Sequence, residues 1–274
     1  MKTLVHLFED SVRKYGNNNL LWEKKEEKYE PTNFNDAKKS VYKFAAGLLE
    51  LGIKKGDKLA LLSEGRNDWI YSELGVLYTG AVNVPLSIKL DSQEIKFRLN
   101  HSEARMLIIS RNQEKKLVEI KDELPLLEKK ILLDEKENLN ENEILFSEIC
   151  QKGDLFLQKN IEEFISRWQS IEENDYANIC YSSGTTADSK GIILSHLNYY
   201  TNIYQAKSLL TIPEHFITLL ILPWDHAFAH TAGVYTFIGF GAGIASIQVG
   251  KSPMETLRNI PTNIREIKPH MILT

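Results

Sequence analysis

Residues Tyr181–Gly191 read YSSGTTADSKG, and this stretch decides how the rest of the chain is interpreted. It follows the apolar run Ala177–Cys180 and precedes Ile192–Ser195, a pattern that predicts a strand, a polar turn and a second strand. Hydroxyl groups and backbone N–H groups donate hydrogen bonds to phosphate oxygens, glycine allows close approach, and lysine supplies a positive charge. The turn is therefore predicted to bind a polyphosphate. The candidate binding residues are Ser182, Ser183, Gly184, Thr185, Thr186 and Lys190.

The turn is not a Walker A loop, which requires a glycine directly before the lysine and Ser or Thr directly after it. Here Ser189 precedes Lys190 and Gly191 follows it. The alternative to a binding turn is a surface turn that is rich in Ser and Thr.

The stretch closely resembles the phosphate loop of the adenylate-forming superfamily, which includes acyl-CoA synthetases, peptide-synthetase adenylation domains and luciferases. The usual form there is Tyr/Phe-Ser/Thr-Ser-Gly-Thr-Thr-Gly-x-Pro-Lys-Gly. This chain departs from that form at Ala187, which replaces the usual glycine, and at Ser189, which replaces the usual proline. Alanine is a problem at a glycine position where φ must be positive, and losing proline removes a backbone restraint.

Three further segments resemble long-chain acyl-CoA synthetases. They are Phe34–Ser63, Leu99–Ala104 and the Leu222–Pro223 pair followed by His226. The resemblance covers essentially the whole chain, and the phosphate loop is its most specific part.

The resemblance implies a two-step reaction with ATP, Mg²⁺ and CoA. A small-molecule carboxylic acid would attack the α-phosphate of ATP, and the CoA thiol would then displace AMP. Lys190 would act catalytically beside Mg²⁺ near the leaving pyrophosphate, and Ser182 would be the hydroxyl on the metal side. His226 would orient the substrate at the pocket wall, or it is a core histidine at a strand end. Trp224 and Phe228 either line an acyl tunnel or belong to the core.

By the same resemblance, the adenine-binding stretch, the ribose-binding aspartate, the hinge and a C-terminal lysine fall beyond this sequence. The chain is therefore interpreted as the N-terminal portion of a long-chain fatty acid–CoA ligase, inactive without the rest of the same chain. Two alternatives stay open. The enzyme could adenylate an aryl or amino acid for CoA or a carrier protein, or the fold could be a non-catalytic nucleotide-binding module.

Composition sets the broad class of the protein. Of 274 residues, 43% are hydrophobic and 26% charged, with a net charge of −4, which is typical of a globular protein and does not favour nucleic acid as a partner. The two cysteines, Cys150 and Cys180, fit a reduced cytoplasmic protein. Glu9 and Asp10 interrupt any secretory signal. Residues Ala229–Gly250 carry no charged side chain and are long enough to span a membrane, but their glycines favour a turn between a buried helix and a buried strand. At most a peripheral membrane contact is expected.

Alternating helix and strand patterns predict an α/β fold, with layered, mainly parallel sheets flanked by helices, as in the N-terminal part of the large domain of an adenylate-forming enzyme. The predicted division is an N-terminal sublobe at 1–170, with a charged peripheral connector at 111–176, and a phosphate-loop sublobe at 171–274. Predicted helices begin or lie at Thr3–Tyr15, after Asn33 or Asn35, at Asn67–Thr79, after Asp91, near Asn142–Cys150 and Ile161–Trp168, after Ser195 and at Pro253–Ile267. Predicted strands are Lys58–Ser63, Ala81–Pro85, Arg105–Ser110, Lys130–Leu133, Phe216–Leu222, Gly243–Val249 and Met271–Thr274.

Overall fold

The computed structural model describes residues 1–182, 189–250 and 252–274. The chain divides into two compact units. The first unit contains Met1–Lys39, Glu64–Ile70 and Leu197–Thr274, and the second contains Ser40–Ser63 and Tyr71–His196. These units are each made of separate segments of the sequence, so they do not test the predicted division into 1–170 and 171–274, which stays a prediction.

In the described part of the first unit, five strands form one sheet in the order β12-β10-β11-β1-β2. Neighbouring strands are parallel, except in the β1–β2 hairpin. These strands are β1 (Asn19–Lys25), β2 (Lys28–Asn33), β10 (Ile217–Leu220), β11 (Gly243–Ser246) and β12 (Met271–Leu273). The helices are α1 (Leu4–Tyr15), α7 (His196–Leu209), the π-helix η3 (Ala229–Tyr235), α8 (Thr236–Phe240) and α9 (Pro253–Ile267).

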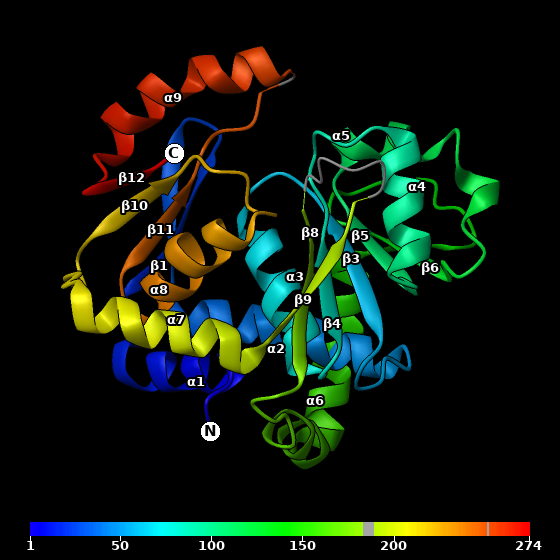
Figure 1. Cartoon of the computed structure of the whole chain (residues 1–274), viewed down its shortest axis with the longest axis horizontal. Helices are drawn as coiled ribbons and strands as arrows, with labels where there is room; N and C mark the ends of the chain where they lie inside the picture. The colour runs from blue at the N-terminus through cyan, green and yellow to red at the C-terminus, as the bar shows by residue number, and fades with distance from the viewer. Residues whose placement is uncertain (183–188, 251) are drawn as a thin grey trace. The chain divides into compact units, whose positions relative to one another are not determined.

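Helices cover both faces of this first sheet. Successive side chains of a strand point to opposite faces. Leu219 of β10 packs in one cluster with Ile267 of α9, which lies along the sheet in Figure 1. Its neighbour Leu220 contacts η3 instead, where a Cβ added to Gly233 would lie 2.6 Å from its Cδ1 atom. The apolar strands are therefore buried on both sides, as their sequences predict.

Over the residues that the structure describes, the second unit contains a seven-stranded sheet in the order β7-β6-β5-β3-β4-β8-β9, in which the β8–β9 pair is antiparallel and the other pairs are parallel. Its strands are β3 (Lys58–Leu62), β4 (Val82–Pro85), β5 (Met106–Ile109), β6 (Lys129–Leu132), β7 (Glu143–Leu145), β8 (Tyr176–Tyr181) and β9 (Gly191–Ser195). Its helices are α4 (Ser92–His101), α5 (Arg111–Glu114), α6 (Phe146–Gln169) and the 3₁₀ turns η1 (Lys115–Leu117) and η2 (Lys121–Glu123). Helices α2 (Phe34–Glu50) and α3 (Asn67–Tyr78) also belong to it, except for their first residues, which are part of the first unit. The predicted mainly parallel α/β fold with a second sheet is confirmed.

Helix α4 packs on one face of the second sheet. Ala60 and Leu62 of β3 share a buried cluster with Ile95 and Leu99 of α4. The helix starts at a capping box, in which the Asp91 side chain accepts from the backbone of Glu94 and the Glu94 side chain accepts from the backbone of Asp91. The box fixes the first turn of α4, where the sequence predicts a helix after Asp91.

The two ends of α2 follow local sequence signals. Of the two predicted caps, Asn33 is the one used, because its Oδ1 accepts from the backbone N–H of Asp36 at 2.8 Å. Gly52 ends the helix with a φ of 81°, a left-handed conformation that glycine adopts without strain.

The region 111–176 is not the peripheral connector that its charge suggests. It supplies β6 and β7 to the sheet, and β7 was not predicted. The predicted helical stretch Ile161–Trp168 and the last five residues of the stretch Asn142–Cys150 belong to one helix, α6, which bends at Asn160 (φ −130°, ψ 32°). The start of the stretch Asn142–Cys150 was wrong, because Glu143–Leu145 forms β7. Ile149 and Phe164 of this helix are fully buried. The charged side chains form its outer surface, and the apolar side chains between them form part of the core.

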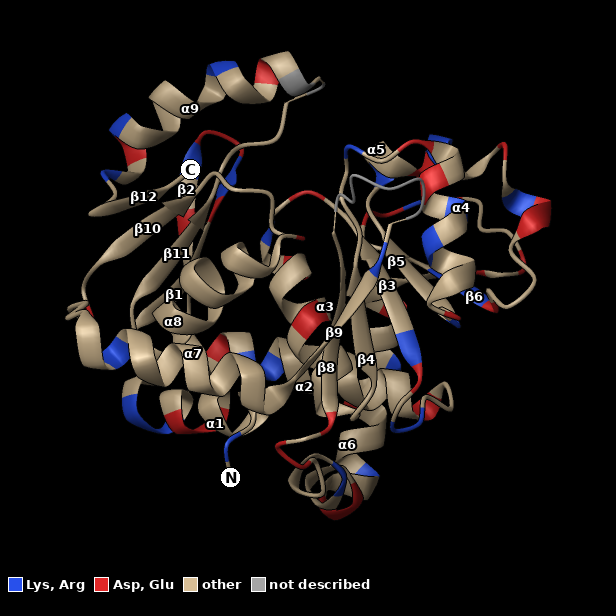
Figure 2. Ribbon diagram, in the orientation of Figure 1, with Lys and Arg blue, Asp and Glu red and all other residues tan. Residues whose placement is uncertain are grey.

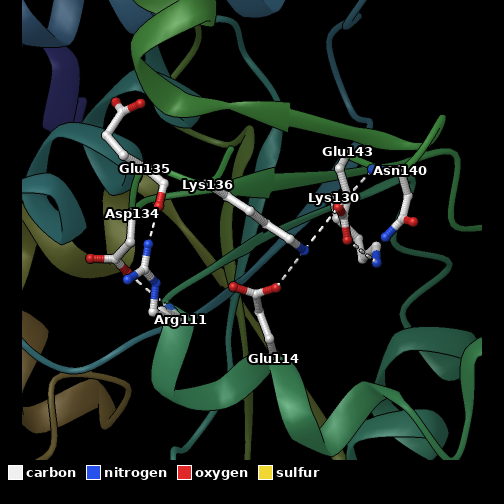
Figure 3. A network of polar contacts seen from close by, with 8 residues as sticks. All are labelled: Arg111, Glu114, Lys130, Asp134, Glu135, Lys136, Asn140 and Glu143. Carbon is white, nitrogen blue, oxygen red and sulfur yellow. Dashed lines mark hydrogen bonds and ion pairs between the residues drawn. The ribbon is translucent and has the colours of Figure 1, made fainter. Parts of the chain in front are cut away.

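A network of charges closes the β6–β7 edge of the sheet (Figure 3). Glu143 accepts from Lys130 Nζ at 2.6 Å, from Lys136 Nζ at 3.0 Å and from the Asn140 backbone N–H at 3.0 Å. Lys136 also donates to Glu114 at 3.0 Å. Burial alone would raise the pKa of Glu143, but these hydrogen bonds outweigh it and lower the pKa to about 2. The carboxylate therefore stays ionised and ties two strands together.

The uncharged segment Ala229–Gly250 folds as η3, α8 and β11 rather than as one long helix. Throughout the described residues, each helix is too short or too polar to cross a lipid bilayer. Cys150 and Cys180 are both free thiols. Figure 2 shows acidic and basic residues interspersed on the elements of each unit.

Candidate phosphate-binding site

The predicted phosphate-binding stretch begins at the carboxyl end of β8, the edge at which parallel α/β sheets bind their ligands. Tyr181 is the last residue of β8 and pairs with Gly191, the first residue of β9. Beyond this pair, the backbone N–H of Ser182 donates to the carbonyl of Lys190 at 3.1 Å. The structure thus brings together Ser182 and Lys190, which the sequence assigns to the same site.

The other predicted binding residues, Ser183, Gly184, Thr185 and Thr186, lie outside the described residues, as does Ala187. Their assignments stay predictions. Ser182 is partly buried and Lys190 is exposed. Among the residues that the structure describes, Lys190 pairs with no carboxylate, so its ammonium group can meet an anionic ligand.

A buried polar trio fixes β8 beneath the site. The carboxylate of Glu73, in the middle of α3, accepts from Asn178 Nδ2 at 3.0 Å and also from Asn83 Nδ2. All three residues are fully buried, and Asn83 and Asn178 face each other where β4 pairs with β8. Sequence reasoning missed this trio, although a glutamate within the apolar helix Asn67–Tyr78 is the signal that could have revealed it.

The Tyr181 side chain fixes the last residue of β8. Its hydroxyl donates to the Arg98 carbonyl at 3.3 Å and lies 2.8 Å from Nδ1 of His101. Burial raises the pKa of the Tyr181 hydroxyl, which therefore stays neutral and keeps its proton for donation. His101 is another residue to which sequence reasoning assigned no role.

His226 belongs to the first unit, whereas Ser182 and Lys190 belong to the second. It lies in a turn before η3, where its backbone N–H donates to Pro223 at 3.1 Å. Its ring is exposed, and Nδ1 accepts from the backbone N–H of Phe228 at 3.2 Å. In the neutral ring, Nε2 is then the donor that remains available. His226 is therefore not a core histidine, and its predicted role in orienting the substrate stays open.

Trp224 and Phe228 differ in their surroundings. Trp224 is 6% exposed and packs edge-on against Trp69 with 5.5 Å between ring centroids, so it belongs to the core. Phe228 is 55% exposed and does not. The structure thus separates two aromatic residues that the sequence could only treat together.

Magnesium has no carboxylate cage in the described residues, where no group of three or more His, Cys, Asp or Glu could hold a metal ion. A Mg²⁺ ion bound mainly through substrate phosphates needs fewer protein ligands. The partly buried Ser182 hydroxyl fits that role, and it stays a prediction.

Comparison with known proteins gives consistent matches along the chain. The long-chain-fatty-acid–CoA ligase ACSBG2 of Xenopus laevis is 22% identical over 97% of this chain and 36% of its own length. The chloroplastic long-chain-fatty-acid–[acyl-carrier-protein] ligase AEE15 of Arabidopsis thaliana is 27% identical over 86% of the chain and 34% of its own length. The chain thus spans about a third of the length of these two relatives.

Among solved structures, the anthranilate CoA ligase AuaEII in complex with anthranoyl-AMP superposes with a TM-score of 0.79. It is 19% identical and covers 98% of this chain, which covers 49% of it. At this identity the likeness concerns the fold. A family model described as AMP-binding enzyme matches residues 8–274, and the chain therefore belongs to the AMP-binding enzyme family.

Proposed function

We propose that this chain is the N-terminal, phosphate-binding portion of an ATP-dependent ligase, which activates a long-chain fatty acid as an acyl-adenylate and transfers the acyl group to CoA. The observation that carries the proposal is the pairing of Ser182 with Lys190 at the carboxyl end of β8, within a stretch that has the composition of a phosphate grip. Membership of the AMP-binding enzyme family and the relatives that are named fatty-acid ligases support it.

The residues of this chain would act on the phosphates. Lys190 would place its ammonium group beside the leaving pyrophosphate, where negative charge accumulates. The hydroxyls of Ser182, Ser183, Thr185 and Thr186, with the backbone at Gly184, would hold the β- and γ-phosphates. When bound, Mg²⁺ would neutralise further phosphate charge, and the Ser182 hydroxyl would be the protein group next to the metal. His226 would orient the carboxylate through Nε2.

The chain alone is proposed to be inactive, because the family resemblance places the adenine, ribose and second-step residues elsewhere in the polypeptide. A small-molecule carboxylic acid and the rest of the same polypeptide are thus the proposed partners, in the cytoplasm, with at most a peripheral membrane contact. Acyl-CoA formed from ATP, CoA and a fatty acid by this chain alone would contradict the proposal.

Binding of ATP with Mg²⁺ by the chain, measured by calorimetry, tests the site itself. Lys190→Met removes the charge but keeps the side-chain length, and the loss of a charge-assisted contact should raise the Kd about tenfold. Lys121→Met, at an exposed lysine of η2, is the matched control and should leave the Kd unchanged. Equal affinities of the two variants would refute a phosphate-binding role of Lys190.

A second function stays in view, because one of the matched relatives is named as a ligase for acyl carrier protein. Pyrophosphate exchange with long-chain, aryl and amino acids, measured on the polypeptide as it occurs in its cells, identifies the acid. Transfer of the acyl group by the same enzyme to CoA or to a carrier protein, each offered separately, identifies the acceptor.

A non-catalytic binding module is the third possibility, and the replacements at Ala187 and Ser189 motivate it. The native mass separates this possibility from the enzymes. A blot band well above 31.4 kDa favours a complete ligase. A band at 31.4 kDa, with ATP binding but without pyrophosphate exchange, favours the module.

A further inference from the structure

Helix α4 contacts the chain on both sides of residues 183–188. Before that segment, the Tyr181 hydroxyl donates to the Arg98 carbonyl at 3.3 Å and lies 2.8 Å from His101 Nδ1. After it, Nη2 of Arg98 donates to the Ser189 hydroxyl at 3.4 Å. Both ends of the phosphate-binding stretch are thus attached to the last turns of a single helix.

The Arg98 guanidinium takes part in both attachments. Its Cζ atom lies 5.2 Å from the centroid of the Tyr181 ring, in a cation–π contact. The residue is only 7% exposed, and desolvation strengthens such contacts. A guanidinium is planar, so it can stack on the ring and still donate in its own plane to Ser189.

Helix α4 is a firm support for these contacts. Its capping box, formed by Asp91 and Glu94, fixes the first turn. Ile95 and Leu99 are almost fully buried in the core of the second unit. A side chain that is anchored on this helix therefore cannot move far without disturbing packed residues.

We propose that Arg98 is a positioning residue of the phosphate-binding site, which holds Ser182 and Lys190 in place through their neighbours Tyr181 and Ser189. Ser182 directly follows Tyr181, and Lys190 directly follows Ser189. Their own link is the hydrogen bond from the Ser182 backbone N–H to the Lys190 carbonyl at 3.1 Å. The proposal rests on the proposed function for the role of the two residues, and on geometry alone for the attachment.

Ser189 gives the inference a second argument. It stands where the related motif usually has proline, which would restrain the backbone but has no side-chain hydrogen-bonding group. In this chain the restraint comes from the hydroxyl and from Arg98. The departure from the motif and the buried arginine 91 residues away are therefore two parts of one arrangement.

Nucleotide affinity gives the first test, by calorimetry with ATP and Mg²⁺ on the whole chain. Arg98→Met keeps the helix propensity and the apolar contact but loses the donor, and it should raise the Kd about fivefold. Arg98→Lys should restore part of the affinity. Ser189→Ala combined with Arg98→Met should be no worse than Arg98→Met alone, because both remove the same bond. Ser189→Pro should rescue Arg98→Met by restoring a backbone restraint.

Hydrogen exchange at the Ser182 amide gives a second test, which does not depend on nucleotide binding. Arg98→Met should accelerate this exchange at least about fivefold, while the buried Ile108 amide in β5 keeps its rate. Ser189→Pro should again reverse the effect.

The two tests separate the two proposals. If the parent chain binds no ATP, the proposed function fails, and the exchange rates still decide the role of Arg98. Unchanged affinity and unchanged Ser182 exchange in Arg98→Met would overturn the inference. Equal losses in Arg98→Met, Arg98→Lys and the Ser189→Pro double variant, with equally lowered urea midpoints, would also overturn it and leave Arg98 a purely structural residue.

Discussion

Gly153→Ala, at the crossing of α6 and α2, is the sharpest test of the second unit. A Cβ atom on Gly153 would lie 1.7 Å from the carbonyl oxygen of Lys43 and 2.6 Å from the backbone nitrogen of Gly47. The contact is reciprocal, because a Cβ atom on Gly47 would lie 2.1 Å from the carbonyl oxygen of Ile149. Both close neighbours are backbone atoms, so no side-chain rotation relieves the clash. The two helices would have to separate by about 1.5 Å to reach an ordinary C···O distance.

Two opposing effects decide the sign of the change. By helix propensity alone, alanine would stabilise α6 by about 1 kcal/mol over glycine. Separation of the helices would disturb Phe146, which stacks on Phe44 with 4.5 Å between ring centroids, and the fully buried Ile149. Overpacking of this kind costs about 3 kcal/mol when backbone must move. The variant should therefore lose about 2 kcal/mol of unfolding free energy, after the propensity gain of about 1 kcal/mol is subtracted.

Urea unfolding, followed by circular dichroism and by tryptophan fluorescence, measures this loss, with Trp168 on α6 as a local probe. Lys152→Ala, at the exposed neighbouring position, is the control and should change the free energy by less than about 0.5 kcal/mol. A Gly153→Ala protein as stable as its parent, or more stable, would refute the close crossing of the two helices.

Two further predictions concern buried carboxylates. The pKa of Glu143 is held at about 2 because hydrogen bonds from the Asn140 backbone and two lysines outweigh the effect of burial. The ionised carboxylate therefore stabilises the fold above its unfolded pKa near 4.5, and this stabilisation is lost as the pH falls toward 2. Glu143→Gln should remove up to about 3 kcal/mol of this pH dependence, measured as urea midpoints between pH 6 and pH 2, and an unchanged dependence on pH would contradict the prediction. Glu73→Ala should cost about 3–5 kcal/mol of unfolding free energy, because it removes the carboxylate that accepts from the buried amide groups of Asn83 and Asn178. Glu73→Gln should cost less, because it keeps one acceptor. Equal losses in the two variants would argue against the trio.

Elements whose signals lie within a few residues were predictable from the sequence. Helix α9 has the predicted bounds, Pro253–Ile267, because Ser252 caps it and proline occupies its first turn. Helix α4 starts after Asp91 as predicted, because the side chains of Asp91 and Glu94 form a capping box there. In each case the hydrogen bonds that define the boundary join residues three apart, so the sequence contains both partners.

Elements defined by distant partners were not predictable in this way. Strand β7 has three residues and exists because it pairs with β6, where Ile131 faces Ile144. Helix α6 was predicted as two separate stretches, whereas it is one helix whose residues Ile149 and Phe164 lie against Gly47 and Tyr42 of α2. Gly153, which looks like a weak point of a helix, is the residue that lets the two backbones approach.

The candidate site also has residues that the sequence could identify and contacts that only the structure reveals. Ser182 and Lys190 could be named from the motif, because their chemistry and their spacing are local. Ser189 could be seen from the sequence only as the loss of a proline, since the group that meets its hydroxyl, Arg98, is carried by another helix. A departure from a binding motif therefore says little about function until the partner of the new side chain is known. Here that partner is a buried cation that also lies over the ring of Tyr181, so Ser189 has a hydrogen-bond partner that its neighbours in the sequence do not reveal.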